Sequence, residues 1–475
     1  MIRSFLKLIA ATALLLSVAQ LTAQEKNNQR DLTGSWQGAL SVGGNSLRIV
    51  FNIKEDSAGR YKATMDSPDQ GAFGIPADSA IVRDSSVRIV FRSFFAEYNG
   101  TCTSNPDSIA GTWSQGGIKL PLMLAFRSQA PEPPKRPQEP KKPYPYNEEE
   151  VTFKNFKDGI TLSGTLTMPS RGGPFPAVVM ITGSGPEDRD ETVFGHKPFL
   201  VLADYLTRRG IAVLRYDDRG TAKSTGNFAI ATSVDFANDA KSAAAYLKTR
   251  KDVRKNRIGL VGHSEGGLVA PMIAADSKEV AFIVMMAGPG VPGDEIIHKQ
   301  AALIALAAGA TEEQVKKQEV TRRKLFNVVE SGKDTGTIKA ELRSLLNGEM
   351  DSVSQANPTA AEAAINAQVA QLSSPWFRYF LTYDPRPALK KVRCPVLALN
   401  GEKDMQVPPQ QNLPEIESAL RVGKNKDFIV RELPGLNHLF QTAITGAPSE
   451  YAKIEETISP EALKLIGDWI LKRCR

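Results

Sequence analysis

The pattern that most restricts the fold of this 475-residue chain is an alternation of apolar runs with amphipathic helical segments, which extends from residue 147 to the end. The apolar runs resemble buried strands in composition and length: PAVVMITGSG, IAVLRYDDRG, RIGLVG, VAFIVMMAG, CPVLALNG and DFIVREL. Helical periodicity lies between them, as in 234–248, where Phe236, Ala240 and Leu247 share one face. The alternation predicts an α/β domain over 147–475, with a mostly parallel, doubly wound sheet.

One stretch of this domain, about 288–388, contains no convincing strand pattern. Two segments in it, TEEQVKKQEV and TAAEAAINAQ, begin with the spacing of a helix capping box, at Thr311 and Thr359. We therefore expect a helical cap inserted between two strands of the sheet.

The region before the α/β domain has a different character. Residues 24–128 carry strand-like runs, SLRIVFNIKE and SVRIVFRSFF, and predict a small all-β barrel or sandwich with Trp36 and Trp113 in its core. A ligand- or carbohydrate-binding module is the alternative. Seven of the 15 residues from 131 to 145 are proline, so 129–146 is predicted to be an extended linker, either a semi-rigid spacer or a segment lying along one domain.

The first residues have the pattern of an export signal. Arg3 and Lys7 precede an apolar stretch too short to span a membrane comfortably, and cleavage sites follow at Ala19 and Ala23. We expect a signal peptide over 1–23, a periplasmic or secreted protein, and no stable membrane insertion after the signal is removed.

Charge and cysteine content exclude other classes of function. The net charge of +7 does not come from a long basic block, and no recognition motif accompanies it, so nucleic acid is not an expected partner. The three cysteines, Cys102, Cys394 and Cys474, lie far apart without metal-ligand spacing. We expect neither a metal nor an organic cofactor.

The segment GLVGHSEGGLVA carries the most reactive candidate, Ser264. A Gly-x-Ser-x-Gly motif alone is weak evidence, but this one follows a buried strand and opens a helix. Gly262 and Gly266 would allow a sharp turn that exposes the serine hydroxyl above the sheet. A serine hydroxyl is a poor nucleophile at neutral pH, so it requires a base and an orienting carboxylate.

The chain has four histidines from which to choose the base. His438, in LPGLNHLF, directly follows the last predicted strand, where a parallel sheet delivers its loops to the carboxyl edge. His263 adjoins the serine, and we expect its side chain to point away. His196 precedes a helix and His298 lies in the predicted cap, so neither is favoured.

The orienting carboxylate is expected in the loop after the preceding strand, VLALNGEKDMQVPP. This loop offers Glu402 and Asp404, and Asp404 is preferred because it stands where the loop turns back. The predicted order along the chain is Ser264, Asp404, His438.

With these residues in place, 147–475 resembles the α/β-hydrolase superfamily, especially its exported esterase-like and serine-aminopeptidase-like branches. The resemblance rests on GHSEGG, GEKD, GLNH and YDDRGTAKSTG. It implies an oxyanion hole formed by the backbone N–H of Glu265 and by a second N–H from the loop TGSGP, with Ser184 the best candidate and Gly183 the next.

The resulting hypothesis is an exported serine hydrolase that cleaves carboxylic esters of small molecules through an acyl-enzyme intermediate. A serine aminopeptidase or amidase on the same fold is the alternative, and a binding protein that works through its β-domain is a third possibility. Neighbouring residues could touch substrate or be purely structural; they are Asp188, Arg189, Arg219, Trp376, Phe377 and Phe380.

Overall fold

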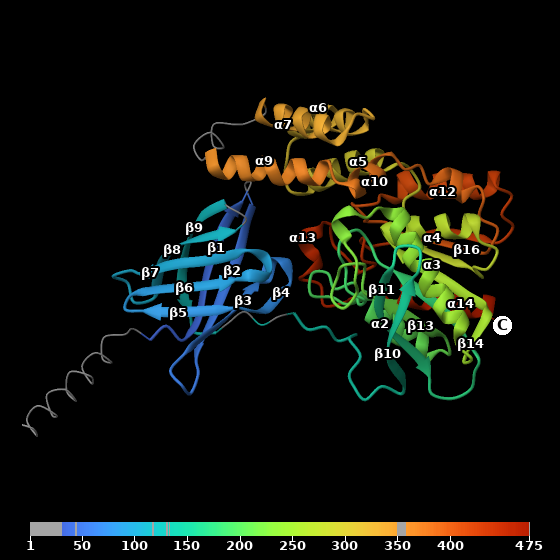
Figure 1. Ribbon diagram of the computed structural model, residues 1–475, viewed down its shortest axis with the longest axis horizontal. Helices are drawn as coiled ribbons and strands as arrows, with labels where there is room; N and C mark the ends of the chain where they lie inside the picture. Colours follow the sequence, from blue (N-terminus) through green and yellow to red (C-terminus); the bar gives the residue numbers. More distant parts are fainter. Residues whose placement is uncertain are drawn as a thin grey trace, which may run out of the picture. The chain divides into compact units, whose positions relative to one another are not determined.

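The computed structural model describes residues 31–474 apart from 43–44, 116–117, 130–131, 133 and 349–357 (Figure 1). The predicted signal peptide lies outside these residues. The chain divides at residues 133–134 into two compact units, with 358–364 counted in the N-terminal one. Among the described helices, none is both long and apolar enough to cross a membrane.

The N-terminal unit is a single curled antiparallel sheet in the order β4-β3-β2-β1-β9-β8-β7-β6-β5. Trp36 and Trp113 are buried in one core with Phe51, Phe91 and Tyr98, so the predicted all-β character is confirmed. The strands are β1 (Gly34–Val42), β2 (Asn45–Glu55), β3 (Tyr61–Ser67), β4 (Ala72–Pro76), β5 (Ser79–Arg83), β6 (Ser86–Phe91), β7 (Ala96–Cys102), β8 (Ser108–Gln115) and β9 (Ile118–Arg127). Two 3-10 turns lie between strands: η1 (Pro68–Gln70) connects β3 to β4, and η2 (Arg92–Phe94) connects β6 to β7.

The proline-rich segment lies along the larger unit from residue 134 onward. Arg136 is half-buried there and donates hydrogen bonds to four backbone carbonyls outside the proline-rich segment, including those of Ala452 and Ile454 at 2.8 and 2.7 Å. The side chain of Gln138 donates to the carbonyl of Ile458. This part of the linker is therefore bound to the larger unit and is not a free spacer.

The larger unit contains an eight-stranded sheet in the order β10-β11-β13-β12-β14-β15-β16-β17. The first two strands pair antiparallel, β11 pairs antiparallel with β13, and the remaining pairs are parallel. The strands are β10 (Tyr146–Asn155), β11 (Ile160–Pro169), β12 (Phe175–Ile181), β13 (Ala212–Tyr216), β14 (Val253–His263), β15 (Ile283–Met286), β16 (Val396–Gly401) and β17 (Phe428–Leu433).

Helices cover both faces of this sheet because successive strand side chains point to opposite sides. Val179 and Leu260 pack in one core with α3, α4, α11 and α12, whereas Val178 and Val261 pack in another with α2 and α14. The helices are α2 (Pro198–Arg208), α3 (Ser233–Thr249), α4 (Glu265–Asp276), α11 (Arg386–Leu389), α12 (Pro409–Val422), α13 (Pro448–Tyr451) and α14 (Pro460–Cys474); η3 (Phe228–Ile230) is a 3-10 turn.

A helical insertion separates β15 from β16. It contains α5 (Gly293–Ala307), α6 (Glu312–Glu330), α7 (Thr335–Gly348), α9 (Pro358–Leu372) and α10 (Pro375–Thr382). The capping box at Thr311 is present, since its side chain accepts from the Gln314 N–H and the Gln314 side chain accepts in return. The expected N-cap at Thr359 is wrong, because α9 already begins at Pro358, a residue that suits the first turn of a helix.

Candidate active site

Ser264 occupies the sharp turn between β14 and α4. Its backbone has φ 52° and ψ −117°, a conformation that non-glycine residues rarely adopt. The turn depends on the two flanking glycines: a Cβ on Gly262 would lie 2.0 Å from the carbonyl oxygen of Gly266, and one on Gly266 would lie 2.0 Å from that of Ile181. The sequence therefore builds a strained turn that holds the Ser264 side chain at the carboxyl end of the sheet.

His438 and Asp404 meet at the same edge of the sheet. Asp404 follows β16 and His438 follows β17, and His438 Nδ1 lies 2.8 Å from Asp404 Oδ2. The other oxygen, Asp404 Oδ1, accepts from the backbone N–H groups of Gln406 and Val407, and both members of the pair are buried. Glu402, the alternative carboxylate, is exposed and accepts from the Gly435 N–H instead.

A cavity of about 370 Å³ is lined by both Ser264 and His438. Its walls come from the loop after β12, from the loops after β16 and β17, and from the helical insertion. The insertion contributes an apolar wall: Ile296, Ile297, Trp376, Phe377 and Phe380. The loop after β12 contributes Gly183, Ser184, Glu187 and Glu191.

The expectation that the side chain of His263 points away from the site is wrong. His263 lines the cavity, with Nδ1 2.9 Å from Glu191 Oε1 and Nε2 3.0 Å from the backbone oxygen of His438. Burial favours the neutral ring, but the charge and hydrogen bond of Glu191 outweigh it and raise the pKa of His263 to about 9. Both ring nitrogens then donate, so His263 is a cation and not a base at neutral pH.

Glu187 and Glu191 are two carboxylates at the cavity that sequence reasoning did not single out. Glu191 Oε1 also accepts from the Gly183 N–H at 2.9 Å, whereas no partner for the buried Oε2 is found among the described residues. Burial and the charge of Glu191 raise the pKa of Glu187 to about 8. Because the Gly183 N–H is engaged, Ser184 and Glu265 are left as the expected oxyanion donors.

Other residues of the same loop have structural roles. Arg189 pairs with Asp217 and with Glu150, each at 2.8 Å, and Asp188 accepts from the Thr192 N–H and hydroxyl. Neither Arg189 nor Asp188 is among the residues that line the cavity. Their ion pairs and hydrogen bonds shape the loop after β12, as the structural interpretation predicted.

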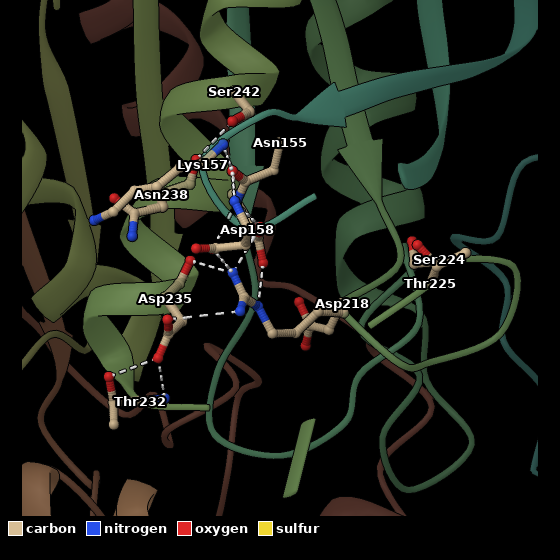
Figure 2. Close-up of polar contacts among 12 residues, drawn as sticks. Asn155, Lys157, Asp158, Asp218, Ser224, Thr225, Thr232, Asp235, Asn238 and Ser242 are labelled. Carbon is tan, nitrogen blue, oxygen red and sulfur yellow. Dashed lines mark hydrogen bonds and ion pairs between the residues drawn. The ribbon is translucent and has the colours of Figure 1, made fainter. Parts of the chain in front are cut away.

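Arg219 also has a structural role, in a charge network beside α3. Figure 2 shows this region, with Asn155, Asp158 and Asp235 of the network labelled. Its guanidinium group donates to Asp239 at 2.7 Å and to Asp158 at 2.8 Å, and lies 3.6 Å from an oxygen of Asp235. Asn155 donates to both Asp158 and Asp239. The network ties the β10–β11 turn and the loop after β13 to the first turns of α3.

Glu265, directly after the nucleophile candidate, places its side chain in a buried polar cluster. Ser233 Oγ donates to Oε1 at 2.5 Å, and Trp376 Nε1 lies 2.9 Å from both carboxylate oxygens. Burial raises the pKa of Glu265 to about 6, while the hydrogen bonds from Ser233 and Trp376 oppose the rise. The motif does not reveal this role, because its middle positions accept any residue type.

Comparison with curated proteins finds relatives that align over part of their length. Esterase EstD of Thermotoga maritima is 37% identical over 158 residues, 33% of this chain and 36% of that protein. The uncharacterized protein YfhR of Salmonella typhi is 31% identical over 125 residues, 26% of this chain and 40% of that protein. The chain thus spans less than half the length of these two relatives.

Solved structures with similar folds include the Pyrococcus furiosus esterase PF2001, with a TM-score of 0.43 and 15% identity over 73% of this chain and 99% of that one. Another is Est1E from Butyrivibrio proteoclasticus, bound to ferulic acid, with a TM-score of 0.38 and 17% identity over 68% and 96% of the two chains. Residues 158–422, more than half of the chain, match the family described as X-Pro dipeptidyl-peptidase (S15). The chain therefore belongs to the X-Pro dipeptidyl-peptidase (S15) family.

Proposed function

We propose that this protein is a serine hydrolase that cleaves carboxylic esters of small molecules through an acyl-enzyme intermediate. The observation that carries the proposal is the single cavity lined by Ser264, at its strained turn, and by His438, which is hydrogen-bonded to Asp404. The name of the relative EstD agrees with esterase chemistry.

The proposed reaction follows from the orientation of the imidazole. Asp404 accepts the Nδ1–H of His438, which leaves Nε2 with its lone pair as the general base for the Ser264 hydroxyl. The serine oxygen then attacks the ester carbonyl, the protonated His438 donates to the departing alcohol, and water hydrolyses the acyl-enzyme by the same base. Asp404 stabilises the imidazolium and fixes its tautomer.

The negative charge on the carbonyl oxygen would be held by the backbone N–H groups of Ser184 and Glu265. Glu265 is the first residue of α4, so its N–H has no acceptor within the helix and the helix dipole favours an anion there. Removing one such donor typically costs on the order of a hundredfold in rate.

The helical insertion serves as the cap in this proposal, and its aromatic side chains form the wall for the acyl group. The apolar wall that the insertion contributes to the cavity suits a small or medium acyl chain. We also propose that the protein is exported, on the basis of the N-terminal sequence pattern.

The test is an assay of the purified protein beside Ser264→Ala on p-nitrophenyl acetate and butyrate and on aminoacyl p-nitroanilides. The proposal expects ester turnover that depends on Ser264 and slower turnover of the anilides. Anilide cleavage that exceeds ester cleavage would replace the esterase with an amidase. Equal inactivity of both proteins on all substrates would remove support for the triad.

A second candidate, an aminopeptidase or amidase, is favoured by the carboxylates of Glu187 and Glu191 and by the family to which the chain belongs. A protonated amine on the acyl group would find two acidic side chains beside Ser264, and its positive charge would favour the ionised form of Glu187, whose pKa is otherwise raised to about 8. The oxygen Oε2 of Glu191, for which the described residues offer no partner, could accept from the same amine. Aminoacyl anilides and their N-acetylated forms separate the candidates, because acetylation removes the positive charge. This candidate requires Glu187→Gln to raise KM for the charged substrate alone.

A further inference from the structure

The carboxylate of Glu265, on α4, joins two other parts of the larger unit that are distant from it in sequence. Ser233 stands at the start of α3, and Trp376 lies in α10 of the helical insertion. Both place hydrogen-bond donors on this one side chain, which is 1% exposed. The contact with Trp376 therefore joins the insertion directly to the residue that follows Ser264.

Burial makes these hydrogen bonds consequential. Removing a carboxylate from water costs free energy unless hydrogen-bond donors replace the lost hydration. Leaving a buried carboxylate oxygen without a donor costs more free energy than one hydrogen bond contributes, on balance, to stability. The N–H of Trp376 points between the two oxygens at equal distances of 2.9 Å, so moving α10 away from α4 would leave the carboxylate short of a donor.

The same contact fixes the wall of the cavity. The Trp376 ring stacks on Phe380 with centroids 5.4 Å apart and planes at 16°, and both residues line the cavity that contains Ser264. Rotation of Trp376 away from Glu265 would change the space available to an acyl group.

We propose that the side chain of Glu265 is a positioning group that holds Trp376 in place beside Ser264. One buried carboxylate thereby ties the acyl wall to the turn that carries Ser264. The proposal deepens the proposed function and rests on it for its catalytic consequence, but the tether itself is independent of substrate. Glu265 acts through its neighbours, and its side chain touches neither the acyl group nor the leaving group.

The central variant is Trp376→Phe, which keeps an aromatic wall but removes the N–H that reaches Glu265. The matched control is Ser233→Ala, which removes a hydrogen bond to the same carboxylate from α3 and leaves the bond to the insertion intact. Glu265→Gln completes the set, because the amide keeps the shape and one acceptor but loses the charge.

The first measurement is amide hydrogen exchange in α10, which requires no substrate. We expect Trp376→Phe to speed exchange there roughly tenfold, the effect of losing one buried hydrogen bond, and Ser233→Ala to leave α10 at the wild-type rate. Unchanged exchange in Trp376→Phe would overturn the tether, as would equal acceleration in both variants.

The second measurement is the ratio of kcat/KM for p-nitrophenyl hexanoate to that for the acetate. We expect Trp376→Phe to raise this ratio by relaxing the wall, and Glu265→Gln to lower kcat for acetate with little change in KM. A wild-type protein inert on esters would refute the proposed function, while faster α10 exchange in Trp376→Phe would still support the tether. Acyl ratios identical in wild type and Trp376→Phe would refute the role in positioning the wall.

Discussion

His263 Nε2 lies 3.0 Å from the backbone carbonyl oxygen of His438, so the residue before the nucleophile candidate supports the loop that carries the base. The other nitrogen of His263 bonds to Glu191, which in turn accepts from the N–H of Gly183. One buried ion pair therefore connects the nucleophile turn, the loop after β12 and the loop after β17. The pair gives the site a stability that depends on pH.

The protein should lose stability as the pH rises from about 6.5 to 9. The pKa of His263 is raised in the folded protein from its ordinary 6.5 to about 9, so the folded state holds a proton that the unfolded chain has released. The contribution is complete below pH 6.5 and lost above pH 9, and it amounts to up to roughly 3 kcal/mol. Urea unfolding at pH 6, 8 and 9.5 measures it. Glu191→Gln should flatten the profile; a slope equal to that of the wild type would refute the prediction.

Ser264→Gly should be more stable than Ser264→Ala. The backbone at this position has φ 52° and ψ −117°, which glycine adopts freely and alanine does not. We expect the glycine variant to be favoured by about 1–2 kcal/mol in thermal or urea unfolding. Both variants lack the Ser264 hydroxyl and should be inactive on esters, so the comparison rests on their stabilities alone. Equal stabilities would show that the turn is not strained.

Asp404→Asn should lower kcat for p-nitrophenyl esters by on the order of 10³- to 10⁴-fold. The carboxylate accepts the Nδ1–H of His438, whereas an amide group can donate and favours the wrong tautomer. Glu402→Gln is the matched control, because this neighbouring carboxylate is exposed and accepts the N–H of Gly435 rather than a histidine N–H. A large effect of Glu402→Gln with little effect of Asp404→Asn would reverse the assignment.

Arg219→Ala should destabilise the fold by about 3–5 kcal/mol, because it leaves the buried Asp239 and the half-buried Asp158 without their cation. Arg219→Lys should restore only part of the lost stability. A lysine ammonium group lacks the planar set of N–H donors with which the guanidinium group bonds Asp158 and Asp239 at the same time. Arg421→Ala provides the comparison: its exposed ion pair with Glu417 should be worth under about 1 kcal/mol. Similar losses in free energy of unfolding for Arg219→Ala and Arg421→Ala would contradict this account.

Much of the larger unit was predictable because its signals are local. Each apolar run expected as a strand overlaps one of β12 to β17, and the segment predicted as 234–248 lies within α3 (Ser233–Thr249). Ser264 could be found because a turn this tight requires glycine at both flanking positions. His438 and Asp404 were found from the order of strands, since parallel strands bring the loops that follow them to one edge.

The remaining site residues were missed because their roles depend on tertiary contacts. Nothing in the sequence around His263 indicates that Glu191, 72 positions earlier, accepts a hydrogen bond from its ring Nδ1. The side chain of Glu265 meets Trp376 across 111 positions, a pairing set by how the insertion packs. Local patterns carry no information on such distances, so a buried carboxylate and an exposed one look alike in sequence.

The central claim is that Ser264 is a nucleophile activated by His438, and covalent labelling tests it most directly. The protein would be treated with a fluorophosphonate and its intact mass measured, beside Ser264→Ala and His438→Ala. The account predicts one adduct per chain, mapped by peptide sequencing to Ser264, absent from the alanine variant and formed far more slowly without His438. A wild-type protein that stays unlabelled, or a label that persists in Ser264→Ala, would contradict it.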